Sequence, residues 1–154
     1  MTPPPARSAA QRTKDTLHRL ENDVDAWVAT AAPDGAEPCL VPLPFVWDGT
    51  SLLIATEADS PTGRNLVATG RARIGIGLAR DVVLIEGAAQ AVTPEELPEE
   101  DAEVFAGKTG LDPRRLADRY LYFRVVPQRV QAWRDGDERD ATDLMRAGRW
   151  PSAG

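Results

Sequence analysis

The chain has 154 residues, which suits one domain with its own core, and 18 Lys and Arg against 24 Asp and Glu give a net charge of −6. An acidic chain without a basic stripe argues against a nucleic-acid partner. A single cysteine excludes an intramolecular disulfide or a thiolate zinc cluster, and without an apolar leader or a run of about 18 apolar residues we expect a cytoplasmic protein with no membrane span.

The N-terminal region divides into a tail and a helix. Residues 1–7 are rich in proline, so we expect a disordered tail, followed by a single domain over residues 8–154. Residues 8–22 predict a helix, with Leu17, Leu20 and then Val24 on one apolar stripe. Such a helix would cap a sheet or a barrel.

Short strands make up most of the remaining chain. They are expected at 26–31, 38–47, 51–56, 72–78, 82–92, 120–126 and 129–134. Pro127 separates the last two, and turn residues at 33–35 and 48–49 favour hairpins. Hairpin-linked strands with few helices predict a mainly β fold, an antiparallel barrel rather than a doubly wound parallel sheet.

A second helix is expected to begin at Thr93. Thr93-Pro94-Glu95-Glu96 has the pattern of a capping box with proline at the first helical position. We expect this helix to run to Lys108, before Gly110 ends it. Another helical turn is expected within residues 112–118.

The strand at 38–47 has apolar residues at every odd position. Its even positions include three prolines, Pro38, Pro42 and Pro44. Backbone N–H groups of alternate residues point to the same neighbouring strand, and proline has no N–H. Three prolines at even positions therefore predict that one side of this strand cannot form a complete ladder of hydrogen bonds. A flat ring at such a gap could contact Leu43, Pro44 and Phe45, although a barrel corner would explain the prolines equally well.

A helix start follows the strand at 51–56. Ser60 is a good N-cap and Pro61 suits the first helical position. The next residues place hydroxyl, N–H and guanidinium donors at the positive end of the helix dipole; they are Thr62, Gly63, Arg64 and Asn65. A phosphate would fit there, but an ordinary capped helix with a solvated Arg64 has the same pattern.

The order of elements along the chain becomes recognisable with two later strand segments. They are Asp81-Val-Val-Leu-Ile-Glu-Gly87 and Arg129-Val-Gln-Ala-Trp-Arg134. The hairpins, the helix start at Ser60 and these strands together resemble the pyridoxamine 5'-phosphate oxidase-like family of flavin-binding split β-barrels over about residues 15–150. The order is most similar to its small actinobacterial flavin- and deazaflavin-dependent members. The resemblance implies a six-stranded antiparallel Greek-key split barrel and a homodimer with the cofactor at its interface.

Carried over by position, the resemblance matches Leu40–Phe45 to the flavin-lining strand, Ala55 and Thr56 to the pair beside the phosphate, and Ser60 to the serine of the phosphate turn. With the other residues of the helix start and Trp133, ten residues are expected to contact the cofactor. They are Leu43, Pro44, Phe45, Ala55, Thr56, Ser60, Thr62, Arg64, Asn65 and Trp133. The Arg and Lys that hold phosphate in the oxidases are replaced here by Pro61 and Thr62, so Arg64 and the helix N–H groups would have to compensate. Trp133 could stack on the ring, contact the second subunit or simply pack in the core. Glu86 could line a pocket or lie on the barrel exterior.

The implied function is that of a flavin- or deazaflavin-dependent oxidoreductase. It would transfer a hydride between FMN, or the deazaflavin coenzyme F420, and a small unsaturated or aromatic substrate. Because the coenzyme supplies the reactive hydride, no catalytic side chain and no metal site are expected. The alternative is a non-catalytic dimer that binds or senses a flavin, haem or another planar ligand, favoured by the lost basic residues.

Overall fold

Residues 5–35, 37–140 and 142–151 are described by the computed structural model of the chain. The helices and strands are α1 (Ala9–Asn22), β1 (Asp25–Ala31), β2 (Pro38–Trp47), β3 (Leu52–Glu57), α2 (Pro61–Thr69), β4 (Arg71–Leu78), β5 (Asp81–Val92), α3 (Glu99–Thr109), β6 (Tyr120–Arg134) and β7 (Asp143–Met145). Short 3-10 turns at 113–115, 117–119 and 137–140 complete the regular structure of these residues. The chain is therefore mainly β, as predicted.

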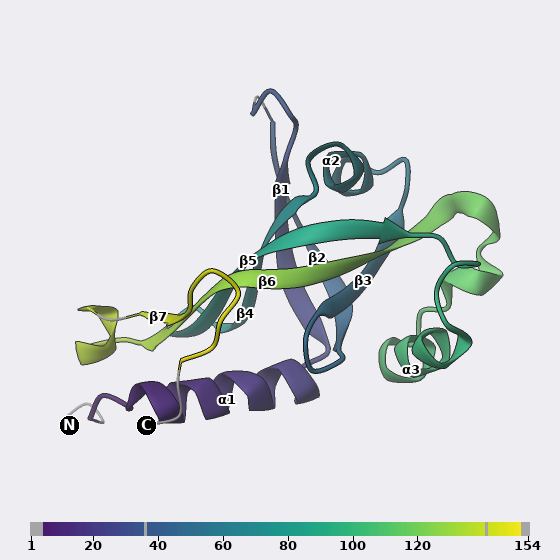
Figure 1. Ribbon diagram of the computed structural model, residues 1–154. Coiled ribbons are helices and arrows are strands. Elements are labelled where there is room, and N and C mark those ends of the chain that lie inside the picture. Colours follow the sequence, from purple (N-terminus) through teal and green to yellow (C-terminus); the bar gives the residue numbers. More distant parts are fainter. Residues whose placement is uncertain (1–4, 36, 141, 152–154) are drawn as a thin grey trace.

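Six strands form a closed antiparallel barrel in the order β3-β2-β1-β4-β5-β6 (Figure 1). The barrel closes where β3 pairs with β6, from Leu52 opposite Val125 to Glu57 opposite Tyr120. Two meanders, β1-β2-β3 and β4-β5-β6, are joined through α2, and β1 pairs with β4. This is the predicted Greek-key barrel, and β7 adds a short pairing to the free part of β6.

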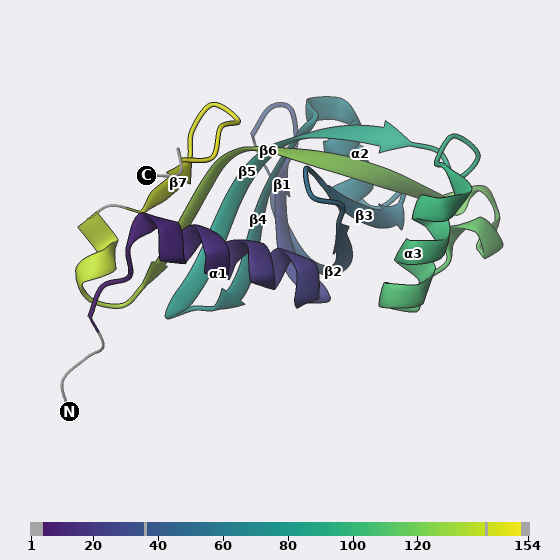
Figure 2. The same ribbon diagram turned by 60° about the horizontal axis from the view of Figure 1, so that its bottom comes forward.

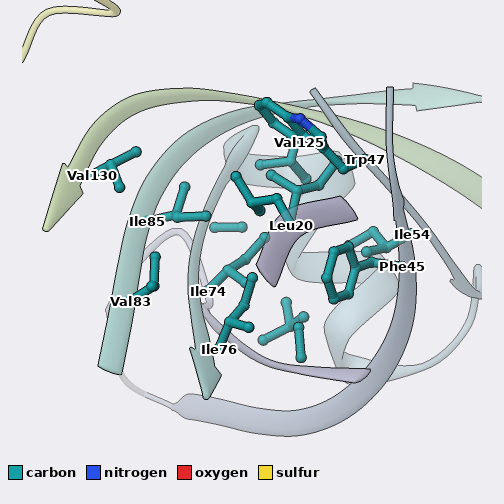
Figure 3. Packing of buried hydrophobic residues seen from close by; sticks show 14 of the residues in the cluster. Leu20, Phe45, Trp47, Ile54, Ile74, Ile76, Val83, Ile85, Val125 and Val130 are labelled. Atoms are coloured by element: carbon teal, nitrogen blue, oxygen red, sulfur yellow. The ribbon is translucent and has the colours of Figure 1, made fainter. Parts of the chain in front are cut away.

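Two helices cover the barrel at its opposite ends, α1 below and α2 above as drawn in Figure 1. Figure 2 shows α1 lying across the strand ends. Leu20 of α1 and Leu66 of α2 are almost fully buried and join the core inside the barrel. Figure 3 shows Leu20 among core side chains such as Ile74 and Ile85. The predicted N-terminal capping helix is confirmed.

The third helix, α3, packs outside the barrel against β2 and β3. Its Phe105 meets the ring of Tyr122 edge-on, with the ring centroids 5.5 Å apart. The apolar residues of this second cluster are Val46, Leu53, Ala55, Leu97, Ala102, Phe105 and Tyr122. The barrel wall at β3 is therefore buried on both faces, which matches its nearly continuous apolar sequence.

Strand β6 is continuous, so the predicted break at Pro127 is wrong. Gly87 lies opposite Pro127 and Glu86 opposite Arg129, which leaves Gln128 as the extra residue of a β-bulge. The pairing of β6 with β3 has already ended at Val125. Proline is tolerated there because β6 has a strand partner on one side only at this point.

The predicted start of α3 is also wrong. Thr93 and Glu96 do exchange the two capping-box hydrogen bonds, each 3.2 Å long. The helix nevertheless begins at Glu99, after Pro98. Proline disfavours helical geometry in the residue before it, so the box closes a single turn and a new helix starts beyond Pro98.

The predicted tail is described only in part, since residues 1–4 lie outside the described residues. Arg7, expected at the end of a disordered tail, is instead held by ion pairs. Its guanidinium lies 2.8 Å from Glu138 and 2.9 Å from Asp15. The ordered domain therefore includes Arg7.

Candidate functional site

Strand β2 has the open edge that its prolines predict. It pairs with β1 from Pro38 to Pro44, but with β3 only from Phe45 onward. The Phe45 N–H donates to Val24 O at 2.9 Å, so N–H groups at odd positions point toward β1. The prolines lie at even positions, facing the side where β3 is absent, and the predicted gap is confirmed.

The three residues predicted to line this gap differ in accessibility. Leu43 and Pro44 are half-buried, whereas the Phe45 side chain is fully buried in the barrel core. The Lys108 ammonium lies 4.6 Å from the centre of the Phe45 ring. Leu43 and Pro44 are available to a ligand at the edge, and the Phe45 side chain is not.

The helix start after β3 is capped by its own serine. Ser60 Oγ accepts the Gly63 N–H at 3.0 Å and donates to Glu57 O at 2.7 Å. It also lies 3.3 Å from Thr56 Oγ1. Gly63 is required here, because a side chain would overlap the Glu57 carbonyl. The predicted N-cap therefore forms, with two hydroxyl groups side by side.

Helix α2 ties this turn to the open edge of β2. Thr62 is buried, and its Oγ1 lies 3.4 Å from Cys39 Sγ on β2. One turn later, Asn65 Nδ2 donates to Thr30 Oγ1 of β1 at 3.2 Å. The predicted ring-lining strand and the predicted phosphate turn thus lie side by side in one chain.

The charges at the turn favour an anion less than the sequence suggests. Arg64 is exposed, but its guanidinium donates to the Asp59 carbonyl at 2.7 Å. The ionisable side chains of the turn are those of Glu57, Asp59 and Arg64, and their net charge is −1. The Thr62 N–H has no acceptor among the described residues. The edge therefore offers apolar surface to a flat ring, and the helix start offers its phosphate only neutral donors.

Two assigned residues lie away from this place. Ala55 is buried beneath α3, on the other face of β3 from Thr56. Trp133 lies opposite Val82 near the end of β6, whereas Thr56 pairs with Leu121 at its start. Within one chain the structure does not bring Trp133 to the helix start.

Two residues at the site were not predicted, Thr30 and Cys39. Thr30 orients Asn65, and Cys39 contacts Thr62. Neither carries a sequence signal, since both occupy ordinary positions in strands. Their roles follow from the packing of α2 against β1 and β2.

Within the described residues, no group of three His, Cys, Asp or Glu side chains is placed to hold a metal ion. The helices of the same residues are all too short or too polar to cross a bilayer.

The sequence profile of the pyridoxamine 5'-phosphate oxidase family matches residues 15–134. The chain belongs to the pyridoxamine 5'-phosphate oxidase-like family. This confirms the resemblance inferred from the order of its strands and its helix start. No curated protein matches this member of the family significantly.

Solved structures with the same fold include proteins of different described functions. An F420 reductase is 18% identical with a TM-score of 0.60, over 73% of this chain and 93% of that chain. A heme binding protein from Mycobacterium smegmatis is 19% identical with a TM-score of 0.63, over 86% and 55%. HutZ, the heme storage protein from Vibrio cholerae, is 15% identical with a TM-score of 0.59, over 90% and 99%. At identities this low, the similarity of the chain to these three structures shows only that they share a fold.

Proposed function

We propose that the chain is a flavin- or deazaflavin-dependent oxidoreductase that binds FMN or F420 along the open edge of β2. The observation that carries this proposal is the 3.4 Å contact between Cys39 of the edge and Thr62 of the helix start. It brings the strand that carries this apolar edge next to the hydroxyl and N–H donors of the helix start. The similarity in fold to an F420 reductase supports the same assignment.

The residues of the edge would hold the ring. Leu43 and Pro44 offer half-buried apolar surface, and Pro42 and Pro44 present no N–H on that side. A strand cannot pair with such an edge, so it stays open to a flat ligand. The hydroxyls of Thr56 and Ser60 and the Thr62 N–H would face the phosphate. When bound, the coenzyme would supply the hydride chemistry, and the protein would orient it and exclude water.

We further propose that the working form is a homodimer. Three large apolar side chains, here called the outer patch, are exposed on the outside of the barrel: Trp27 by 54%, Leu40 by 62% and Leu84 by 39%. Trp27 and Leu84 both lie opposite Gly75 on β4, which adds no side chain between them. A second copy on this patch would bury apolar surface that a monomer leaves in water. It would also offer its own Trp133 to a site that lacks it.

A second candidate is a dimer that binds haem or another planar ligand without turnover. The engagement of Arg64, the cation of the helix start, by the Asp59 carbonyl favours it. The fold is shared with a heme binding protein and a heme storage protein. Such a ligand would use the apolar edge alone.

Comparing FMN with riboflavin separates the ring from the phosphate. We expect FMN to bind at least tenfold more tightly than riboflavin in fluorescence titrations, because neutral donors at the helix start still favour the phosphate. Thr56→Val, which removes one of the proposed phosphate donors, should reduce this ratio, whereas Thr13→Val on α1 should leave it unchanged. Reduced F420 or FMN mixed with quinones and conjugated ketones then tests for turnover by absorbance.

Equal affinity for FMN and riboflavin would contradict a phosphate site at Ser60. Stoichiometric binding of haemin, with no binding of FMN or F420, would replace the proposed oxidoreductase by the second candidate. Binding of a coenzyme without reoxidation by any acceptor would leave a binding or sensing protein.

A further inference from the structure

A cavity of about 620 Å³ lies on the outer side of the barrel, where β1 ends and α2 passes into β4. None of the ten residues assigned to the coenzyme lines it. Its walls come from β1, the α2–β4 junction, and the bulge shared by β5 and β6. The volume is within the range of small-molecule sites.

Small residues make up much of the cavity lining. Ala29, Ala31 and Ala88 line it together with Gly87. Gly87 has to remain small, because a Cβ would lie 2.5 Å from Val125 Cγ1 and 3.1 Å from the Val126 carbonyl. These small side chains leave an apolar surface that the face of a ring could contact.

The rim carries positive charge in an acidic protein. Arg73 pairs with Glu86, whose carboxylate also lies 3.8 Å from Arg129. The side chain of Arg71 has no hydrogen-bond or ion-pair partner among the described residues. The charged side chains that line the cavity are Arg71, Arg73 and Glu86, which give it a local net charge of +1. The whole chain, in contrast, carries a net charge of −6.

We propose that this cavity binds a small flat ligand bearing a carboxylate or phosphate, with the Arg71 guanidinium holding the anion. A planar guanidinium donates two parallel hydrogen bonds to such a group. Gln128 on the bulge offers an amide to ring heteroatoms. The cavity meets the coenzyme edge at Thr30, whose hydroxyl is bonded to Asn65, but the proposal does not rest on the proposed oxidoreductase function.

The test uses nicotinate and its uncharged analogue nicotinamide as probes on the full chain. We expect nicotinate to shift the amide resonances of Gly70, Gly87 and Ala88 saturably in a nitrogen-15 titration. Nicotinamide should bind at least tenfold more weakly, because it cannot form the charge-assisted pair. Inorganic phosphate should compete with nicotinate.

Arg71→Gln should weaken nicotinate at least tenfold and leave nicotinamide nearly unchanged, while Arg71→Lys keeps part of the affinity. Arg80→Gln, at the exposed β4–β5 turn, is the matched control and should have no effect. No saturable shift, equal binding of the two probes, or equal effects of Arg71→Gln and Arg80→Gln would overturn the proposal. The cavity borders the outer patch, so the mass of Arg71→Gln is measured as well. Loss of nicotinate binding together with a changed mass would assign Arg71 to subunit contact and overturn the ligand site.

Discussion

Glu138 shows how one residue can fix a distant segment of the chain. Only 5% of it is exposed, and its carboxylate accepts from the backbone N–H and the guanidinium of Arg7 and from the Arg134 N–H. The bond to Arg7 lowers the pKa of Glu138 from 4.5 to about 2, against the opposing effect of burial. The same bond raises the pKa of Arg7.

This lowered pKa predicts a pH-dependent stability. A folded pKa below the unfolded one gives stabilisation that is complete above pH 4.5 and lost as the pH falls toward about 2. The free-energy difference between wild type and Glu138→Gln should shrink by about 2 kcal/mol between about pH 6 and about pH 3. Urea unfolding at the two pH values measures it. Exposed Glu21→Gln is the control, and a pH-independent difference would contradict the prediction.

The residue scale also shows what local chemistry can predict at the candidate site. The Ser60 cap and the proline parity of β2 follow from single residues and their neighbours, and both are found. The engagement of Arg64 by the Asp59 carbonyl could not be predicted, because it depends on the path of the turn. The same holds for the contact of Thr62 with Cys39, 23 residues away.

At the scale of elements, the bulge between β5 and β6 depends on Gly87. We expect Gly87→Val to lower the free energy of unfolding by about 2 kcal/mol or more, because the added side chain overlaps Val125. Gly107→Ala is the opposite case, since its position in α3 has open space. It should stabilise the protein by about 0.5–1 kcal/mol. Thermal unfolding of both variants tests the pair, and a neutral Gly87→Val would contradict the packing described.

The elements mispredicted from sequence are those controlled by non-local pairing. Pro127 normally indicates a strand end, and only the position where β3 stops explains why β6 continues. The cavity around Arg71 has no motif either, because its lining residues come from separate strands and from the end of α2. Strand periodicity identifies such positions, but not which of them become neighbours.

At the scale of the whole molecule, the outer patch predicts self-association. The wild type should sediment at about twice the chain mass of 16.7 kDa. Trp27→Asp should give a single chain, because it places a charge within the buried contact. Val104→Asp, on exposed α3, is the control and should remain dimeric. A monomeric wild type would contradict the proposed homodimer.

The pairing of Arg7 with Glu138 joins positions 131 residues apart in the chain. Closure of the barrel likewise requires residues 120–125 of β6, which pair with β3. During synthesis the barrel cannot close until these residues have left the ribosome, and the Arg7–Glu138 pair forms later still. Refolding of the complete chain, in which β3 and β6 are both present from the outset, should therefore follow a different order of events from folding during translation.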